Sequence, residues 1–346
     1  MIAPLASPLL LSRLDEILSA LPSLRVGVLG DFTLDAYWYA DMARAQLSRE
    51  TPLHARPVVR ETYSCGAAAN VAWNLTALGV GAAQAITVLG EDWRGNLLRD
   101  LLRQAGVAID SVLTFPGWST PLFGKIILAA PHAQQEDARL DFINPRPLEN
   151  AAQAALVQAV ESLLPGLDAL IIADYHPTGI VTPLVIDALN RLAQQRPQVV
   201  FVADSRERIG QLRHMVLKPN RLEAAAWLFP ERDPAALTLE DLSAAAGQKA
   251  GSDLPVFITL GDQGCLLCQG GQAQSILAVR VPPPVDPVGA GDAFLAALAV
   301  GLAAGATASE AGWLATLAAA VTVRKRGVTG TASPDEIRAL AKAEGQ

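Results

Sequence analysis

The 346-residue chain is poor in cysteine, in aromatic residues and in charge. Three cysteines, an odd number in so long a chain, argue against a disulfide scaffold and favour a reducing, cytoplasmic location. Charged residues make up 18% of the chain, and 27 Lys and Arg against 34 Asp and Glu give a net charge of −7. A nucleic-acid-binding surface needs a basic excess, so we expect no nucleic-acid partner.

A basic leader and an obvious membrane span are also missing, although 51% of the residues are hydrophobic and the mean hydropathy is +0.28. The uncharged stretch Ala293–Ser309 has 17 residues, whereas a spanning helix needs roughly 20 mainly apolar residues. Its alanines suit a helix buried in a protein core. The apolar segment Met1–Ser12 has no Lys or Arg ahead of its leucines. We therefore expect neither a signal peptide nor a membrane partner.

Cys265 and Cys268 form a C-x-x-C pair, but the chain has no second such pair and only four histidines. The surrounding segment, Val256–Leu267, has the pattern of a strand and a turn. We interpret the two cysteines as small core residues, with zinc or redox chemistry as the alternative.

Short β-branched runs alternate with longer stretches rich in Ala and Leu. The short runs predict strands at Arg25–Leu29, Gln84–Leu89, Leu170–Ala173, Val199–Ala203, Met215–Leu217 and Val256–Leu260. The longer stretches predict helices at Ala67–Leu78, Gly95–Ala105, Asn150–Leu164, Pro183–Gln194, Leu222–Trp227, Leu239–Ala250, Asp292–Leu302 and Ser309–Arg324. This alternation indicates βαβ units, and continuous apolar strands indicate a parallel sheet covered on both faces. We expect an α/β fold, whose covered sheet explains the hydrophobic content.

Two stretches, Thr33–Thr62 and Leu113–Pro147, break this alternation with prolines, aromatics and mixed polarity. The second contains a strand-like run, Phe123–Leu128, and neither has a helical period. We expect them to form a small antiparallel sheet that projects from the main one. The chain shows no low-complexity linker and no repeat.

The sharpest local motif is Asp286-Pro-Val-Gly-Ala-Gly-Asp292, which an uncharged helical stretch follows at once. Small residues at a helix N-terminus expose backbone N–H groups, which form an anion site together with the helix dipole. A carboxylate at such a site would repel a bound anion, so its presence there indicates a chemical role. Asp292 could accept a proton from a hydroxyl while the amides hold charge on a phosphoryl group. The alternative is that Asp292 only caps the helix.

Two further motifs lie early in the chain. Gly66-Ala-Ala-Ala-Asn70 enters a helix, where small residues allow close approach of a ligand and Asn70 offers a donor and an acceptor. Gly30-Asp-Phe-Thr-Leu-Asp35 follows the first predicted strand. Ligands bind at the carboxyl ends of strands in such sheets, and Asp31 and Asp35 suit sugar hydroxyls. Each aspartate could equally serve a turn or a cap.

Two late motifs each follow a strand. Lys218-Pro-Asn-Arg-Leu-Glu223 places Asn220 and Glu223 one helical turn apart, where they could hold a hydrated Mg²⁺. Thr259-Leu-Gly-Asp-Gln-Gly264 is a glycine-bounded turn across which a nucleotide can lie. No G-x-x-x-x-G-K-[ST] pattern occurs, which disfavours a P-loop NTPase.

Together and in this order, the motifs resemble the PfkB family of ribokinase-like carbohydrate kinases, from about Arg25 to Leu340. The G-A-G-D and G-A-A-A-N turns are the family's two signature regions, and Gly90–Gly95 matches a further segment. The resemblance implies a ribokinase-like three-layer α/β/α fold with a mostly parallel central sheet. It also implies a single kinase domain over residues 1–346, with a β-lid formed by about 33–62 and 113–147.

The resemblance further implies ATP-dependent phosphorylation of a sugar hydroxyl and a role for each motif. Asp292 would be the catalytic base, and the amides of Gly289, Ala290 and Gly291 would form the anion hole. The residues implied to hold the sugar are Asp31, Asp35, Gly66, Asn70 and Arg139. The residues implied to line the nucleotide site are Lys218, Asn220, Glu223, Thr259, Gly261 and Gly264. Mg²⁺ would be served by Asn220 and Glu223 through water, and K⁺ by Asp286 and the carbonyl of Val288.

The chain departs from the family pattern at two positions. Cys65 stands where the early signature usually has a first glycine, and Pro287 stands where a Thr or Val-like residue is usual. Pro287 lacks an N–H and a hydroxyl, which bears on the cation site.

Within the family, the chain is most similar to the heptose-7-phosphate kinases of ADP-heptose synthesis. The similarity lies in Leu47–Pro52, Arg139–Phe142 and Asp174-Tyr175. A Lys-Gly usually follows that Asp-Tyr, whereas this chain has His176-Pro-Thr-Gly179. The exchange removes a positive charge near the expected substrate phosphate.

We therefore expect a cytoplasmic ATP:sugar phosphotransferase that uses Mg²⁺ and forms a homodimer through its lid. A nucleoside kinase is the alternative within the fold, and Tyr37, Trp38 and Tyr39 are candidates for a base clamp. A non-catalytic sugar or nucleotide sensor is the alternative outside catalysis. The intact Asp292 argues against a sensor, which need not keep a base.

Overall fold

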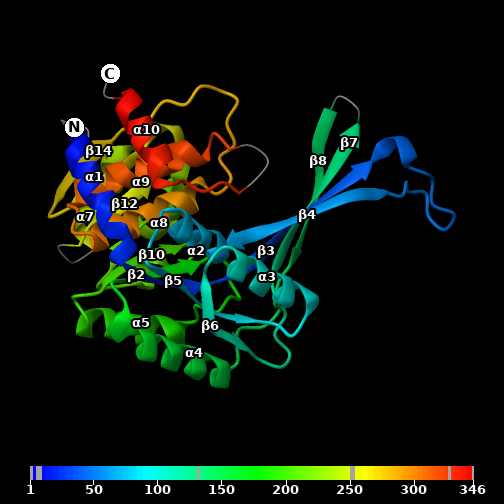
Figure 1. Ribbon diagram of the computed structural model, residues 1–346, viewed down its shortest axis with the longest axis horizontal. Coiled ribbons are helices and arrows are strands. Elements are labelled where there is room, and N and C mark those ends of the chain that lie inside the picture. The colour runs from blue at the N-terminus through cyan, green and yellow to red at the C-terminus, as the bar shows by residue number, and fades with distance from the viewer. Residues whose placement is uncertain (1–2, 5–9, 131–132, 250–253, 326–328, 345–346) are drawn as a thin grey trace.

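The computed structural model describes residues 3–4, 10–130, 133–249, 254–325 and 329–344. Two sheets and the helices around them make up these residues (Figure 1). Most of Met1–Ser12, for which we expected no signal peptide, lies outside the described residues, as does Ala250 at the end of one predicted helix.

The large sheet has ten strands in the order β1-β14-β13-β12-β11-β10-β9-β2-β5-β6. The strands are β1 (Ala3–Pro4), β2 (Arg25–Gly30), β5 (Ala82–Leu89), β6 (Ala108–Thr114), β9 (Ala169–Asp174), β10 (Val200–Ser205), β11 (Val216–Leu217), β12 (Val256–Thr259), β13 (Cys265–Gln269) and β14 (Gln272–Ile276). Only the pairs of β13 with β12 and β14 are antiparallel within this described sheet. The expected α/β fold with a mostly parallel sheet is confirmed.

Helices cover both faces of the large sheet (Figure 1). They are α1 (Leu11–Ala20), α2 (Ala68–Ala77), α3 (Trp93–Gln104), α4 (Asn150–Leu163), α5 (Pro183–Gln195), α6 (Arg221–Leu228), α7 (Leu239–Lys249), α8 (Ala290–Ala303), α9 (Ala308–Thr322) and α10 (Pro334–Glu344). Short 3₁₀ turns lie at Leu21–Ser23, Met42–Arg44, Leu164–Gly166, Ile209–Gln211, Pro234–Ala236 and Gly261–Gln263.

The core has two layers because strand side chains alternate between the faces of the sheet. In β2, Val26 and Val28 pack among α1, α2, α8, α9 and α10, whereas Leu29 packs on the other face among α4–α7. Every residue of the central strand β9 is buried. This double burial accounts for the apolar strand runs and for the hydrophobic composition.

The small sheet projects from the body of the molecule, on the right in Figure 1. Its strands are β3 (Phe32–Asp41), β4 (Val58–Ala67), β7 (Leu122–Ala130) and β8 (Ala133–Phe142), in the order β4-β3-β7-β8. We expected it to be antiparallel, and this was wrong for one pair, since β3 and β7 run parallel. The chain passes through β5, α3 and β6 of the body between them, which allows a parallel return.

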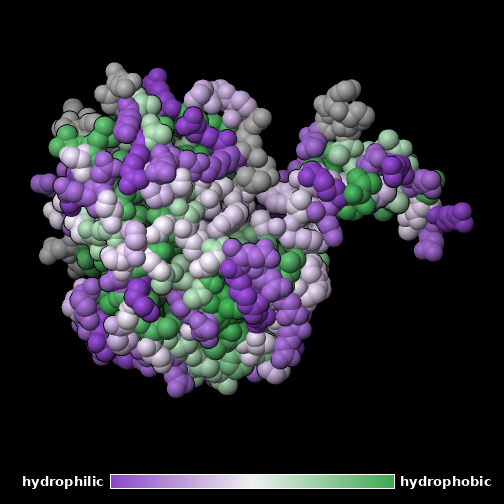
Figure 2. All heavy atoms as spheres, in the orientation of Figure 1, coloured by the Kyte–Doolittle hydropathy of each residue, from purple (hydrophilic) through white to green (hydrophobic). Residues whose placement is uncertain are grey.

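The second irregular stretch was placed slightly too early. Its first residues, Leu113 and Thr114, end β6 of the large sheet, so the small sheet takes only the later part. Figure 2 shows apolar and polar residues interleaved on the projecting sheet. Its exposed large apolar side chains include Val58, Val59, Leu140 and Phe142.

The alanine-rich stretch Ala293–Ser309 is not one helix. It fills α8, turns at Ala304 and Gly305, and enters α9. Residues 293–301 of α8 are buried, in keeping with the expected core position. Among the described residues, no helix is long and apolar enough to cross a membrane.

Cys265 and Cys268 lie in β13 as free, buried thiols. Residues three apart in a strand point to opposite faces, and Cys265 packs in one core layer and Cys268 in the other. Burial raises the pKa of Cys265 to about 12 and that of Cys268 to about 11. The two thiols therefore cannot chelate one metal, and both are core residues as interpreted.

Candidate active site

Asp292 lies in the first turn of α8, at the carboxyl edge of the parallel strands. The sequence led us to expect it as the first residue of the helix, but α8 begins at Ala290 and Gly289 is its N-cap, with φ of 80°. Asp292 is the third helical residue and does not cap the helix with its side chain. The alternative of a mere helix cap is therefore not supported by the contacts of this carboxylate.

Two donors hold the Asp292 carboxylate, one on each oxygen. The amide of Asn70 donates to Oδ2 at 2.7 Å, and the hydroxyl of Tyr175 lies 3.1 Å from Oδ1. Burial raises the pKa of Asp292 to about 6, with Asp204 adding to the rise while Asn70, Tyr175 and Lys218 oppose it. A half-buried carboxylate with this pKa is poised to accept a proton near neutral pH.

The helix N-terminus next to Asp292 presents backbone donors. Among the described residues, the N–H groups of Gly289 and Gly291 make no hydrogen bond. The N–H of Ala290 donates to the carbonyl of Pro287 at 3.2 Å, so an anion would have to compete for it. Two of the three expected anion-hole donors are thus open in this conformation.

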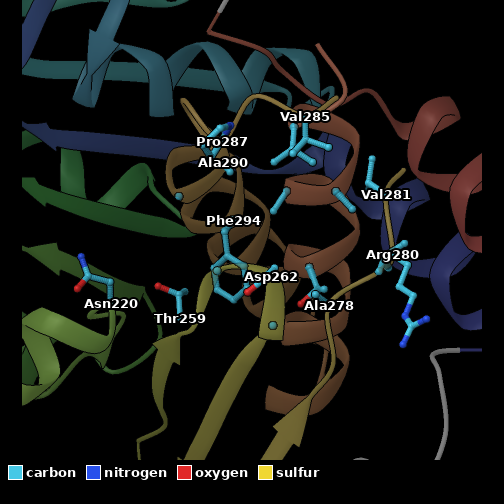
Figure 3. Close-up of a pocket in the computed structure, with 18 of the residues that line it drawn as sticks. Asn220, Thr259, Asp262, Ala278, Arg280, Val281, Val285, Pro287, Ala290 and Phe294 are labelled. Atoms are coloured by element: carbon cyan, nitrogen blue, oxygen red, sulfur yellow. The ribbon is translucent and has the colours of Figure 1, made fainter. Parts of the chain in front are cut away.

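A cavity of about 910 Å³ adjoins this helix N-terminus (Figure 3). Asn220 and Thr259 lie on one side of it, Ala290 and Phe294 of α8 in the middle, and Val281 and Val285 of the loop before α8 on the other. Gly261, Gly264 and Gly291 also line it. Its size and apolar walls are those of a small-molecule site.

Lys218 does not line this cavity; it lies beneath the site and is 3% exposed. Its ammonium pairs with the carboxylate of Asp204 at 2.8 Å. Burial opposes the charge of Lys218, but Asp204 outweighs burial and raises the pKa of the amine. The charge that we expected to face the nucleotide is therefore neutralised inside the protein.

Asn220 and Glu223 form a reciprocal cap at the start of α6. The Asn220 side chain accepts the N–H groups of Leu222 and Glu223 at 2.9 and 3.0 Å, and Glu223 accepts the N–H of Asn220 at 2.7 Å. Burial and the neighbouring Asp204 raise the pKa of Glu223. Of this pair only Asn220 reaches the cavity wall.

The loop before α8 carries the residues expected near K⁺. The Asp286 carboxylate accepts the N–H of Val288 at 3.1 Å, and the Asp286 N–H donates to the carbonyl of Val323. These bonds fold the loop back onto the end of α9. Asp286 and Val288 thus lie in a tight turn, and the assignment of this turn to K⁺ stays a prediction.

Asp31 was expected to hold the sugar, but the structure gives it a different task. Its carboxylate is 3% exposed and accepts the N–H groups of Tyr175, His176 and Ile180, each at 2.9 Å. Burial raises the pKa of Asp31 against these three bonds. The carboxylate is committed to the loop that follows β9 and positions that loop beside the base.

One face of the small sheet carries the charged groups that approach Asp292. Asp35, Phe123 and Asp141 are register partners across β3, β7 and β8. Burial raises the pKa of Asp35 to about 7, with a further rise from Asp292 and a fall from Arg139. This face therefore contributes a second carboxylate and a cation to the neighbourhood of the base.

Close packing and ring contacts fix this face. A Cβ at Gly66 would collide with the Asp35 carboxylate, so the glycine leaves room for this side chain in its observed position. Arg139 lies over the ring of Phe123 at 4.2 Å and pairs with Asp141 at 2.7 Å. Phe123 in turn packs 5.0 Å from the ring of His176, which joins the small sheet to the loop after β9.

Three site residues were missed by sequence reasoning. Asp204 is the penultimate residue of β10, close to the strand end where ligands bind, and that position alone could have drawn attention to it. Tyr175 was noted only as part of a subgroup segment, and Lys125 not at all. The part of the cavity wall that α9 provides, including Ala319 and Ala320, had no local signal because it looks like any buried helix face.

Comparison with known proteins gives a consistent result. The family model described as pfkB family carbohydrate kinase matches residues 31–336. The chain is 33% identical over 325 residues to the bifunctional protein HldE of Trichlorobacter lovleyi, covering 93% of this chain and 64% of that protein. It is 33% identical over 320 residues to the bifunctional protein HldE of Magnetococcus marinus, covering 90% and 62%. The chain thus spans less than two thirds of these relatives.

Solved structures show the same fold. The tetrameric inhibited form of phosphofructokinase-2 from Escherichia coli superposes with a TM-score of 0.72 at 20% identity, covering 93% of this chain and 100% of that one. Ribokinase of Arabidopsis thaliana complexed with ribose and ATP superposes with a TM-score of 0.66 at 18% identity, covering 92% and 99%. The expected ribokinase-like architecture is confirmed.

Proposed function

The chain belongs to the pfkB family of carbohydrate kinases, and from this premise we propose that it transfers the γ-phosphoryl group of ATP to a hydroxyl of a sugar phosphate. One juxtaposition carries the proposal. The held carboxylate of Asp292 and the open N–H groups of Gly289 and Gly291 meet in one helical turn. Of these residues, Gly291 lines the cavity of about 910 Å³.

The proposed step uses each of these groups once. Asp292 accepts the proton of the attacking hydroxyl, whose oxygen forms a bond to the γ-phosphorus as the bond to the β–γ bridging oxygen of ATP breaks. The N–H groups of Gly289 and Gly291 hold the charge that develops on the transferring phosphoryl group, and ADP leaves. Thr259, Gly261, Gly264 and Asn220 line the nucleotide side.

The donor set fits a metal that is held mainly by phosphates and water. Mg²⁺ binds ATP-type sites through one or two protein oxygens and keeps several waters. In keeping with this, no cluster of three acidic, His or Cys side chains suited to a metal occurs within the described ranges. Glu223 and Asn220 would serve Mg²⁺ through water, and bound Mg²⁺ would neutralise phosphate charge.

We also propose that the enzyme binds K⁺. Phosphofructokinase-2 from Escherichia coli, a structural neighbour at 20% identity, has been solved in complex with potassium. Asp286 and the carbonyl of Val288 would supply oxygen ligands here, from a turn that Pro287 stiffens.

We favour a heptose 7-phosphate as the substrate, in line with the curated HldE relatives. Lys125 and Arg139 on the small sheet lower the pKa of the nearby Asp35. They pair with Glu136 and Asp141 at 3.3 and 2.7 Å, and a sugar phosphate would compete with these carboxylates for their charge. His176 replaces the lysine usual in the similar group; burial lowers its pKa to about 4, so it is neutral at pH 7. Its Nε2 is buried without a partner among the described residues.

The aromatic residues of the small sheet weigh against a nucleoside kinase. Arg60 lies over the Tyr39 ring at 3.5 Å and Lys125 over the Tyr37 ring at 5.8 Å. A Cβ at Gly124 would collide with Trp38, so this ring already packs on the neighbouring strand. These contacts leave the three rings with partners other than a nucleobase.

We propose that the small sheet acts as a lid and joins two copies of the chain in a cytoplasmic homodimer. Val58, Val59, Leu140 and Phe142 are between 46% and 53% exposed, and a second copy of the chain would cover apolar surface there. Sedimentation of the wild-type chain beside a Val59→Glu variant tests this, and a monomeric wild type would contradict it.

A coupled ADP-release assay over a substrate panel tests the function. The panel holds heptose 7-phosphate, the unphosphorylated heptose, fructose 6-phosphate, ribose and nucleosides, each with ATP and Mg²⁺. We expect the sugar phosphates to be turned over fastest. Turnover only with nucleosides would establish the alternative kinase, and binding of sugar and ATP without ADP release would establish a sensor.

A further inference from the structure

We propose that Lys218 and Tyr175 are positioning residues for Asp292: Lys218 holds Asp204, and this directs the single hydroxyl proton of Tyr175 to Asp292. The inference deepens the proposed function and rests on Asp292 as the base. It assigns a role to a tyrosine outside the family's signature turns and a new role to Lys218.

Tyr175 lies between two carboxylates. Its hydroxyl oxygen is 3.1 Å from Oδ1 of Asp292 and 3.2 Å from Oδ2 of Asp204. A phenol has one proton, so it can donate to only one of the two ionised carboxylates at a time. The carboxylate that does not receive the proton faces an oxygen lone pair. The hydrogen bond from Tyr175 to Asp292 therefore depends on whether Asp204 already has another donor.

Lys218 decides this competition. Its ammonium lies 2.8 Å from Oδ2 of Asp204, the same oxygen that Tyr175 approaches. Lys218 is 3% exposed and Asp204 is 5% exposed, so the pair is enclosed in the protein. A carboxylate that is already paired with a buried cation is stabilised less by a further hydrogen bond than a carboxylate that has no such cation. The proton of Tyr175 is left for Asp292.

The two donors then fix the base by both oxygens. Asn70 donates to Oδ2 and Tyr175 to Oδ1, which orients the carboxylate plane and leaves lone pairs on its accessible side. The Tyr175 ring is held in its turn, because Arg206 lies over it at 5.5 Å and the Tyr175 N–H donates to Asp31.

The charged groups around Asp292 come from several elements. They are Asp35 from β3, Asp204 from β10, Lys218 after β11 and, facing Lys218 and Asp204, Glu223 from α6. The acidic groups favour the protonated form of Asp292, and the Lys218 charge and the two hydrogen bonds favour the ionised form. Removing the bond from Tyr175 should therefore raise the pH at which Asp292 ionises.

The first experiment is a titration of the Asp292 carboxyl by carbon-13 NMR of aspartate-labelled protein, with the signal assigned by its loss in Asp292→Asn. It needs no substrate. We expect Tyr175→Phe to shift the midpoint upward by about one pH unit, since a hydrogen bond to a charged group is worth about that much. The acidic limb of kcat against pH should move by the same amount.

Tyr63→Phe is the matched control. The Tyr63 hydroxyl donates to Glu61 at 2.8 Å on the small sheet, so this variant also removes a tyrosine–carboxylate bond. We expect no shift of the Asp292 midpoint. A purely structural role of Tyr175 would lower stability and leave the midpoint in place, which would overturn the proposal.

A double-mutant cycle separates Lys218 acting through Tyr175 from Lys218 acting by its charge alone. In the Lys218→Met background the Tyr175 proton should turn to Asp204. Adding Tyr175→Phe there should shift the Asp292 midpoint by less than a third of its shift in the wild type. An equal shift in both backgrounds would contradict the coupling. If Lys218→Met does not fold, Lys218→Arg takes its place, because it keeps the positive charge beside Asp204. We expect this variant to keep the wild-type midpoint of Asp292. A shift as large as that of Tyr175→Phe would contradict the coupling.

The outcomes distinguish this inference from the proposed function. If Asp292→Asn keeps wild-type turnover, the base is wrong and the function proposal fails. If Asp292→Asn abolishes turnover while Tyr175→Phe leaves both the midpoint and the pH profile unchanged, only the positioning role fails.

Discussion

Two neighbouring regions of this molecule are built in opposite ways. Around Asp292, polar side chains from distant parts of the chain hold one another, with Asn70, Tyr175, Asp204 and Lys218 in one network. The adjoining cavity is walled by glycine backbone and apolar side chains such as Gly264 and Phe294. The first region is specified by side-chain chemistry and the second by the path of the backbone.

The difference determines what each region can tolerate. A polar network loses its function when one group changes, because the remaining buried groups lose a partner. A wall made of backbone tolerates changes of polar side chains but not of the conformation that shapes it. Substitutions in the polar network should therefore lower kcat, whereas substitutions in the cavity wall should lower the free energy of unfolding.

The largest effect is expected from Asp292→Asn. An amide cannot accept the hydroxyl proton, and general-base catalysis contributes about 10²–10⁴-fold, so kcat should fall by roughly 10³-fold. The KM for ATP should change little, because the cavity wall is untouched. Steady-state kinetics at saturating sugar measure both constants.

Asn74→Ala is the control for this substitution. Asn74 donates to Asn70 one turn further along α2 and does not touch Asp292, so kcat should change far less. If Asp292→Asn raised the KM for ATP and left kcat intact, the division between the two regions would not hold.

The next effect is expected from Gly264→Ala in the cavity wall. Gly264 has φ of 92°, and a Cβ there would collide with the backbone of Ile276–Ala278. We expect the free energy of unfolding to fall by about 3 kcal/mol. Gly270 has φ of 57° with open space around it, so Gly270→Ala should lower that free energy by only about 1 kcal/mol. Urea titrations measure the free energy of unfolding of both variants. Equal losses would contradict the prediction, because they would show that the chain around Gly264 moves to accommodate the new Cβ.

The third effect is a gain in stability on loss of the base. The Asp292 pKa is raised from 3.8 to about 6, so its contribution to stability is complete below about pH 4 and is lost as the pH rises through 6. Above that range the folded state holds a half-buried charge that the unfolded state solvates fully. Asp292→Asn should therefore be more stable than the wild type at pH 8, by about 2 kcal/mol. Urea titrations at pH 8 and pH 4 should show this difference shrink at the lower pH; a constant difference would refute it.

The smallest effect is expected at the turn that leads from the small sheet into α2. Ala67 has φ of 51° and ψ of −129°, a conformation that favours glycine. Ala67→Gly should relieve strain and raise the free energy of unfolding by about 1 kcal/mol. Ala67 lies three residues before Asn70, so the substitution tests whether the polar network around Asp292 also depends on a strained main chain. Thermal unfolding measures the change, and a lower midpoint would contradict the prediction.

The sequence predicts the elements that have a strong local pattern. The strands beginning at Arg25 and Val256, and the helices α2–α9, were found with ends shifted by a few residues. The Asp292 turn was found because its small residues and its carboxylate are unusual next to a helix. The pairing of Asn70 with Asp292, 222 positions apart, needed the fold.

Other features had no local signal. β6 and β14 carry mixed polarity because each lies toward an edge of the sheet, and α1 and α10 are half-exposed helices at the chain ends. Asp31 was assigned to the substrate because its sequence position at a strand end is the same for a ligand and for a loop anchor. Only its three backbone partners distinguish the two.

The loop after β9 is fastened at several points through its main chain. Asp31 takes the N–H groups of Tyr175, His176 and Ile180, and Arg208 donates to the carbonyls of His176 and Pro177. The main chain at position 176 is therefore held independently of the His176 side chain, whose ring packs against Phe123. A change of side chain at this position would leave the path of the loop in place and alter the contact between the loop and the small sheet.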